Sequence, residues 1–286
     1  MSHRCRLLLW VLSLHLAAMP AVGAAAAGPE TVHFASATMP PTPLQLRLAR
    51  ERGRAPVAGG GDDLVGYLYR PPGPGPFPAI VILHGCDGIT VTDAGVVAAP
   101  FVAHGYVVLA VDSFATRGQK DTCAIGAITP RTADAFGGLD YLVQQPFVIA
   151  DRVAVLGYSQ GGGAALDAVA QGGMRDVMPH RFKAAVAYYP SCRREGFTAS
   201  VPTLILIGDL DSWMPAEDCR TMIAHGMPGG APIALTVYPL ATHGFDVPNT
   251  QPAFLYGHRM EYDERAARDA QQKVDEFLHE QTGGSR

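Results

Sequence analysis

A serine that could act as a nucleophile stands between closely spaced glycines. Ser159 is the centre of the segment Gly157-Tyr158-Ser159-Gln160-Gly161, which has the pattern G-x-S-x-G. An aliphatic run at 153–156 precedes it and a segment with helical spacing follows, so we expect Ser159 on a sharp turn from strand to helix. Side chains at 157 and 161 would collide across such a turn, and glycine avoids the collision. A phosphate-binding turn is the alternative, but neither the dinucleotide fingerprint nor the Walker A pattern is present.

A serine hydroxyl needs a general base, and in this arrangement the chain order is nucleophile, acid, histidine. His243 follows the aliphatic run at 233–237 through a short loop that could reach over Ser159. His258 is the main alternative. We therefore predict His243 as the base.

Two carboxylates follow the aliphatic run at 203–207, and either could be the acid. Asp211 lies deeper in this loop than Asp209 and precedes Pro215, which can open a helix. We predict Asp211, whose carboxylate would hold the imidazole tautomer and stabilise the imidazolium. The alternative is that either Asp caps a helix.

Backbone donors for a tetrahedral oxyanion usually come from the residue after the nucleophile and from a turn after an earlier strand. Here these are Gln160 and the turn His84-Gly85-Cys86-Asp87-Gly88, in which Cys86 would present its N–H. The side chain of His84 is expected to be structural. The predicted oxyanion hole is therefore Cys86 with Gln160.

Short aliphatic runs alternate with helical spacing along most of the chain. Runs of this kind are typical of strands buried on both faces of a parallel sheet. The runs are 79–83, 106–111, 153–156, 184–188, 203–207 and 233–237, and the helical segments are 94–103, 131–143, 163–170, 215–225 and 261–279. The alternation predicts an α/β fold, a doubly wound sheet with helices on both faces. Residues 64–69 form a further strand candidate, and the alternation of Leu44, Leu46 and Leu48 with other residues predicts an edge strand.

The first 24 residues resemble a signal peptide. Arg4 and Arg6 precede an apolar run at 7–18, and Val22 and Ala24 suit a cleavage site. The run is about a dozen residues, too short to span a membrane easily, and an uncleaved anchor is the alternative. We expect a bacterial periplasmic or secreted protein without a stable membrane anchor. The expected organisation is a signal peptide over 1–24, a loop-rich segment with an edge strand over 25–63 and one α/β domain over 64–286.

Composition excludes several classes of protein. The 286 residues are 48% hydrophobic and 17% charged, which argues against disorder. The net charge of −4 falls by two, to −6, when Arg4 and Arg6 leave with the signal peptide. An acidic balance argues against nucleic acid as a partner. Cys5 would leave too, and the even number that remains favours two disulfides over free thiols in an oxidising compartment.

Several motifs together resemble the dienelactone hydrolase family of the α/β-hydrolases. They are His84-Gly85-Cys86, Gly157-Tyr158-Ser159-Gln160-Gly161, Gly208-Asp209-Leu210-Asp211 with Pro215, and His243-Gly244-Phe245. The resemblance covers about residues 64–278. It implies an eight-stranded, mostly parallel sheet and supports Ser159, Asp211 and His243 as the triad. Because the namesake enzymes use a cysteine where this chain has Ser159, a serine carboxylesterase is the expectation.

The strand order of that family also implies how the cysteines pair. It places the third strand beside the fourth and the sixth beside the seventh, and one cysteine follows each of these strands. Since a disulfide needs Cα atoms within about 7 Å, the resemblance implies Cys86–Cys123 and Cys192–Cys219 among three possible connectivities.

The site is expected to be open, because only about a dozen residues separate Pro190 from Val201, where many relatives insert a lid. The candidate pocket residues lie on loops at strand ends: Ser113, Phe114, Arg117, Tyr188, Tyr189, Trp213 and Phe245. The aromatic residues could equally pack in the core, and Arg117 could pair with a nearby Asp.

The sequence thus predicts a serine hydrolase that cleaves small carboxylic esters or lactones through an acyl-enzyme. No cofactor or metal is expected, since no H-E-x-x-H or close His/Cys pair occurs. The oligomeric state is not predicted. The alternatives are a peptidase of the prolyl oligopeptidase type, which normally carries a large additional domain, and a binding protein with a hydrolase fold but no turnover.

Overall fold

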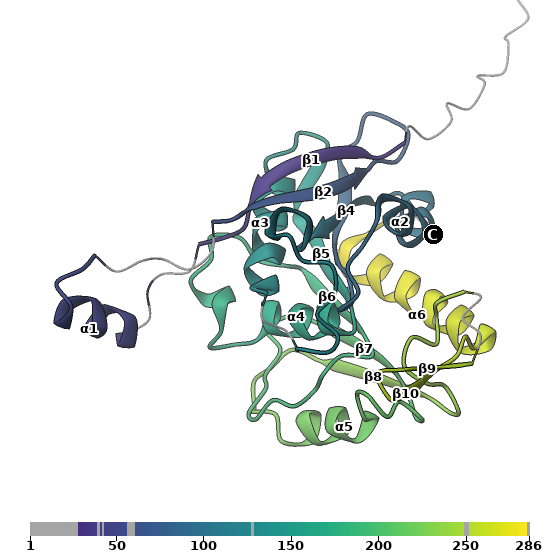
Figure 1. The fold of residues 1–286 in the computed structure, drawn as a ribbon. Helices are drawn as coiled ribbons and strands as arrows, with labels where there is room; N and C mark the ends of the chain where they lie inside the picture. Colours follow the sequence, from purple (N-terminus) through teal and green to yellow (C-terminus); the bar gives the residue numbers. More distant parts are fainter. Residues whose placement is uncertain are drawn as a thin grey trace, which may run out of the picture.

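A computed structural model describes residues 28–38, 41, 43–55, 61–126, 129–248 and 252–284. The predicted signal peptide, residues 1–24, lies outside the described residues. One eight-stranded sheet forms the centre of the fold, and helices cover both of its faces (Figure 1). Over the described part of the chain, no helix combines the length and the apolar character needed to cross a membrane.

The sheet has the strand order β1-β2-β4-β3-β5-β6-β7-β8. β1 and β2 pair antiparallel, as do β2 and β4, and all other neighbours run parallel. The prediction of a mostly parallel eight-stranded sheet is confirmed. The strands are β1 (Glu30–Ala35), β2 (Asp63–Tyr69), β3 (Phe77–Leu83), β4 (Val107–Asp112), β5 (Val148–Tyr158), β6 (Ala184–Tyr188), β7 (Thr203–Gly208) and β8 (Ile233–Tyr238).

The helices form one layer on each face of the sheet. They are α2 (Val91–Ala103), α3 (Arg131–Val143), α4 (Gln160–Val169), α5 (Ala216–Ala224) and α6 (Glu264–Thr282), with short 3-10 turns η1 (Ala115–Arg117) and η2 (Met174–Asp176). α2 and α6 pack on the face that carries Ile80 and Ile82. α3 and α4 pack on the opposite face, which carries Val81 and Leu83. Since both faces are covered, the buried stretches of the central strands, such as 79–83, 107–111 and 153–156, are apolar throughout, which is the pattern seen in the sequence.

The edge strand predicted at residues 44–48 is wrong. These residues lie in the helix α1 (Pro43–Glu51), and the edge strand is β1, nearer the N-terminus. Leu, Gln, Arg and Ala all favour helix, and the segment lacks the β-branched residues that favour strands. Alternation of Leu with other residues was therefore a weaker signal than helix propensity.

A hairpin that the sequence did not predict follows the loop of His243. It consists of β9 (Ala253–Leu255) and β10 (His258–Met260), which pair antiparallel. Met260 also forms an isolated parallel bridge with His243. The hairpin is thereby tied to the candidate site, although its short strands are largely exposed and give no hydrophobic pattern.

Candidate active site

Ser159 occupies the turn between β5 and α4 in a strained backbone conformation. Its φ is 53° and its ψ is −115°, which residues with a side chain rarely adopt. A Cβ atom on Gly157 would lie 2.1 Å from the carbonyl oxygen of Gly161. A Cβ atom on Gly161 would lie 2.3 Å from the carbonyl oxygen of Leu83. The turn thus requires glycine on both sides of Ser159, for the steric reason that the sequence suggested.

The structure brings Ser159, His243 and Asp211 into one chain of hydrogen bonds. His243 Nε2 lies 3.0 Å from Ser159 Oγ, and His243 Nδ1 lies 2.8 Å from Asp211 Oδ2. A carboxylate can only accept, so Nδ1–H donates to Asp211 and Nε2 is left to accept from the serine hydroxyl. All three side chains are buried.

The carboxylate of Asp211 is itself held by its own loop. Its Oδ1 accepts hydrogen bonds from the backbone N–H groups of Trp213 at 2.9 Å and Met214 at 2.8 Å. Oδ2 is thereby left for the imidazole of His243. Two aromatic rings pack against that imidazole, Tyr189 at 4.6 Å and Trp213 at 5.1 Å between centroids.

The loops that carry Asp211 and His243 cross in close contact. Leu210 N–H donates to the carbonyl of Ala241 at 2.9 Å. A Cβ atom on Gly208 would lie only 2.2 Å from that same oxygen. The loop after β7 and the loop after β8 can therefore approach only because Gly208 has no side chain.

The alternative acid and the alternative base lie elsewhere. Asp209 is exposed and pairs with Arg220 at 3.5 Å. His258 Nδ1 lies 3.1 Å from Ser212 Oγ, and its ring stacks on Trp213. Neither side chain takes part in the hydrogen bonds of Ser159.

The predicted oxyanion donors lie beside Ser159 and are linked to each other. A Cβ atom on Gly85 would lie 3.9 Å from Ser159 Cβ, so the turn that contains Cys86 runs against the serine. Gln160 is the first residue of α4, where N–H groups have no intrahelical acceptor. Thr122 donates from its N–H to the Cys86 carbonyl at 2.8 Å and from its hydroxyl to Gln160 Oε1 at 3.0 Å. Sequence reasoning missed Thr122, which stands in no motif.

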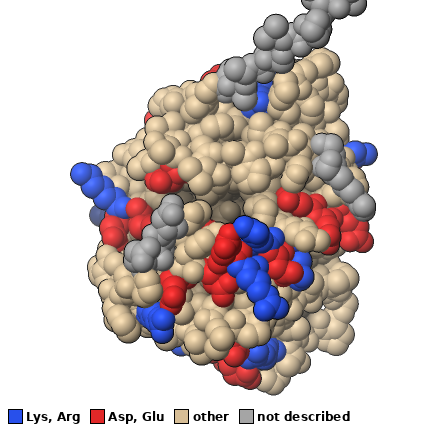
Figure 2. All heavy atoms as spheres, turned by 90° about the vertical axis from the view of Figure 1, so that its right-hand side faces the viewer, with Lys and Arg blue, Asp and Glu red and all other residues tan. Residues whose placement is uncertain are grey.

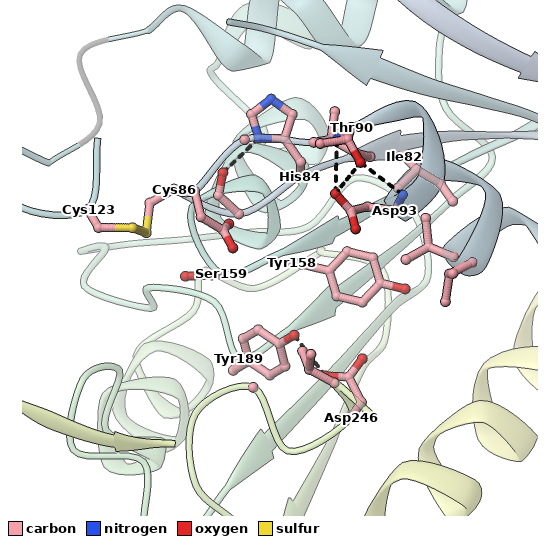
Figure 3. Close-up of a pocket in the computed structure, with 18 of the residues that line it drawn as sticks. Ile82, His84, Cys86, Thr90, Asp93, Cys123, Tyr158, Ser159, Tyr189 and Asp246 are labelled. Atoms are coloured by element: carbon pink, nitrogen blue, oxygen red, sulfur yellow. Dashed lines mark hydrogen bonds between the residues drawn. A yellow bond between two sulfur atoms is a disulfide. The ribbon is translucent and has the colours of Figure 1, made fainter. Parts of the chain in front are cut away.

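Both disulfides implied by the family resemblance are present. Cys86 and Cys123 have Cα atoms 4.9 Å apart, and those of Cys192 and Cys219 are 4.8 Å apart. The first disulfide lines the cavity next to Ser159 (Figure 3).

His84 is structural, as expected, and its imidazole is neutral. Its Nδ1–H donates to the Gly85 carbonyl at 2.7 Å, and its Nε2 accepts from the backbone N–H of Ser113 at 3.2 Å. Burial, assisted by the nearby charge of Arg131, lowers the pKa of His84 to about 3. The ring therefore stays uncharged and fixes the start of the turn.

Ser159 opens into a cavity of about 940 Å³. Tyr158, Tyr189 and Asp246 lie close together on the side of Ser159 away from the Cys86–Cys123 disulfide (Figure 3). The lining also includes residues of α2, α6 and the β9–β10 hairpin. The face that carries these elements is hollowed, with acidic and basic side chains near the rim (Figure 2).

Phe114, Tyr189 and Trp213 line the cavity as predicted, whereas four other predicted pocket residues do not. Tyr188 and Phe245 are buried in the core on the α6 face of the sheet. Ser113 is buried at the end of β4 and contacts His84 through its backbone. Arg117 pairs with Asp134 at 2.8 Å and with Asp62, the alternative that was weighed for it. Position at a strand end does not fix side-chain direction, because successive side chains point to opposite faces.

Charged residues of the cavity are mostly acidic. Among the described residues that line it, four carboxylic side chains accompany one ammonium group: Asp87, Asp93, Asp112, Asp246 and Lys120. The Tyr189 hydroxyl donates to Asp246 Oδ1 at 2.8 Å, and burial raises the pKa of Asp246 to about 6. Burial also raises the pKa of Asp87. No three His, Cys, Asp or Glu side chains of the described ranges gather into a group that could hold a metal ion.

A parallel sheet with a serine on a strained turn after a central strand, facing a His-Asp pair on later loops, defines an α/β-hydrolase. The sequence model of the dienelactone hydrolase family matches residues 64–282, and the chain belongs to that family. The resemblance stated from the motifs is thereby confirmed.

Solved structures with the same fold include the dienelactone hydrolase-like promiscuous phosphotriesterase P91 from metagenomic libraries. Its TM-score is 0.66 at 17% identity, covering 89% of this chain and 99% of that one. The dienelactone hydrolase of Anabaena variabilis has a TM-score of 0.59 at 17% identity, covering 90% and 100%. At these identities the likeness shows the fold.

Curated relatives include cutinases. Cutinase est1 of Thermobifida alba is 28% identical over 185 residues, which are 62% of this chain and 57% of that protein. Cutinase 1 of Thermobifida cellulosilytica is 26% identical over 187 residues, 62% of this chain and 64% of the relative. The chain thus matches less than two thirds of the length of either cutinase.

Gly161→Ala should destabilise the protein by about 3 kcal/mol or more, since the added methyl group overlaps the backbone of β3. The matched control is Gly163→Ala in the same helix, where the nearest atom is the end of the flexible Arg194 side chain at 3.3 Å. Its effect should stay within about 1 kcal/mol. Urea unfolding of both variants measures the difference, and equal free energies of unfolding would contradict the steric argument.

Asp246 should make the protein less stable as pH rises from about 4 to about 6. Its pKa is raised to about 6 in the folded chain, against about 3.9 when unfolded, so the folded state binds more protons in that range. Asp246→Asn should therefore reduce the loss of unfolding free energy between pH 4 and pH 7 by about 1–3 kcal/mol. Urea unfolding at both pH values, with the exposed Asp151→Asn as control, tests this, and an unchanged pH slope would refute it.

Proposed function

We propose that this chain is a serine hydrolase that cleaves carboxylic esters, with Ser159 as nucleophile, His243 as general base and Asp211 as the acid of the triad. The observation that carries the proposal is the unbroken hydrogen-bond chain from Ser159 Oγ through His243 to Asp211. Membership of the dienelactone hydrolase family and the likeness to proteins named cutinase support an ester as substrate.

The reaction follows from the direction of these hydrogen bonds. Ser159 Oγ attacks the ester carbonyl carbon while its proton passes to His243 Nε2, and Asp211 stabilises the imidazolium. The carbonyl oxygen becomes an oxyanion, for which the backbone N–H groups of Cys86 and Gln160 are the proposed donors. The tetrahedral intermediate then expels the alcohol, which takes the proton from His243. A water molecule, activated by the same histidine, releases the acid from Ser159.

The cavity suggests a small ester or lactone with little negative charge. Phe114 and Trp213 offer apolar surface near the triad, and Val96, Val97 and Pro100 of α2 add aliphatic surface. The carboxylic side chains of the lining would repel an anionic substrate. We further propose that the protein works outside the cytoplasm, since two disulfides suit an oxidising compartment and agree with the predicted signal peptide.

Replacing a residue of the proposed triad should abolish turnover, whereas replacing the alternative base His258 or the alternative acid Asp209 should not. Ser159→Ala and His243→Ala should each lower kcat by at least about 10⁴-fold on a nitrophenyl ester. His258→Ala and Asp209→Asn should stay within about threefold of the wild type, since neither residue takes part in the hydrogen bonds of Ser159.

A fluorophosphonate probe gives an independent measurement of the same proposal. It should label the wild-type protein at Ser159 and leave Ser159→Ala unlabelled. A wild-type protein that is neither labelled nor active would point to a binding protein without turnover. Cleavage of peptides in preference to esters would favour the peptidase alternative.

Substrate charge should matter as the cavity predicts. Nitrophenyl esters with neutral, carboxylate and trimethylammonium acyl ends of matched length separate charge from size. At low salt, kcat/KM for the carboxylate ester should be about tenfold below that of the neutral ester, and the gap should narrow at 0.5 M salt. Asp87→Asn should narrow it too, whereas the exposed Asp151→Asn, outside the cavity, should not. Equal rates for the three esters would remove the electrostatic argument.

A further inference from the structure

Arg131 is a buried arginine whose hydrogen-bond partners are backbone carbonyls beside the candidate site. It lies at the start of α3 and is 3% exposed. Its Nη1 donates to the carbonyl of His84 and its Nη2 to the carbonyl of Gly85 at 2.8 Å. Arg131 takes part in none of the ion pairs between described residues. The guanidinium carbon of Arg131 lies 4.7 Å from the centroid of the Phe114 ring.

Keeping a cation at this position is costly for the fold. A buried charge loses its hydration and destabilises the protein unless it is paired or fully hydrogen-bonded. The Nε of Arg131 has no partner among the described residues, and burial lowers the pKa of Arg131 to about 10. The group thus remains charged at neutral pH, although an apolar side chain could fill the same space at less cost.

The contacts of Arg131 fix one particular peptide group. The carbonyl of Gly85 accepts from Arg131 on one hand and from His84 Nδ1 at 2.7 Å on the other, so two donors orient it. The peptide bond between Gly85 and Cys86 is trans, and its N–H points opposite to its C=O. Holding the Gly85 carbonyl toward Arg131 therefore holds the Cys86 N–H away from Arg131.

The far side of Cys86 is fixed as well. Its own carbonyl accepts from the N–H of Thr122 at 2.8 Å, and its side chain is bonded to Cys123. The Cys86 N–H is therefore held from both neighbouring peptide groups. A cation at the oxygen end of the Gly85–Cys86 peptide also polarises the peptide, which makes its N–H a stronger donor.

We propose that Arg131 is a positioning residue for the oxyanion hole: it orients the Gly85–Cys86 peptide and strengthens the Cys86 N–H as a donor to the developing oxyanion. This inference rests on the proposed esterase function and deepens it. Arg131 does not line the cavity, and it acts through the backbone of the turn. Its contribution is expected in the transition state, where the oxygen carries full negative charge, and hardly in ground-state binding.

The test compares Arg131→Met with the wild type in two measurements. On a nitrophenyl ester, kcat should fall by about 10²- to 10³-fold with KM changed less than about threefold. The second measurement is the inhibition constant of a trifluoromethyl ketone. Ser159 Oγ adds to its carbonyl carbon, the serine proton passes to His243, and the former carbonyl oxygen becomes an oxyanion. This constant should rise in parallel with the loss of kcat. The value of kcat is calculated per site titrated with the fluorophosphonate probe, so that unfolded protein does not count.

The matched control is Arg181→Met. Arg181 also donates to backbone carbonyls, those of Asp176, Met178 and His180, in a loop that does not line the cavity. Its kcat per titrated site and its inhibition constant should equal those of the wild type. If Arg131→Met does not fold, Arg131→Lys tests the inference instead. The lysine ammonium keeps the positive charge but cannot donate to both carbonyls in the planar geometry of a guanidinium. We expect kcat to fall about tenfold and the inhibition constant to rise in parallel.

The outcomes separate this inference from the proposed function. A wild-type protein without esterase activity or labelling defeats the proposed function. If the wild type is active and an Arg131 variant has the same kcat per titrated site and the same inhibition constant, only the role of Arg131 is overturned. An Arg131 variant with a lower melting temperature and unchanged constants shows a purely structural role and overturns the inference as well.

Discussion

The backbone at Ser159 is the constraint on which the rest of the site depends. A residue with positive φ between a strand and a helix is strained, and the surrounding structure has to hold it there. Two glycines allow the chain to pass β3 and itself at distances that no side chain permits. The result is a hydroxyl fixed at the carboxyl edge of the sheet, where loops bring Asp211, His243 and the turn of Cys86 to it.

Those loops are locked to one another as well as to the sheet. Gly208 lets the loops of Asp211 and His243 cross, and Thr122 joins the turn of Cys86 to Gln160. The imidazole of His243 packs against the rings of Tyr189 and Trp213. Groups held in this way need little reorganisation when charge develops on a substrate, which is the main source of electrostatic stabilisation in hydrolases.

The sequence predicted the fold and the main polar residues because each rests on a local signal. Aliphatic runs identify the buried strands, and Ser159, Asp211 and His243 each follow one of them in chain order. Tyr188 was misassigned because the side of the sheet that a strand-end residue faces depends on the strand's exact end. Phe245 and Arg117 lie beyond the strand ends, where contacts with distant segments decide the direction of the side chain. Arg131 and Thr122 gave no signal, since an arginine at a helix start and a threonine in a loop usually face solvent. Their contacts join segments far apart in the chain.

Helix α2 makes the cavity a promising object for protein engineering. Val96, Val97 and Pro100 form part of its wall, yet α2 carries none of the residues of the Ser159–His243–Asp211 chain. Libraries that vary these three positions can therefore enlarge, narrow or recharge the wall without altering the groups that hold Ser159. The wall of the cavity and the proposed triad can thus be varied separately, because they lie on different segments of the chain.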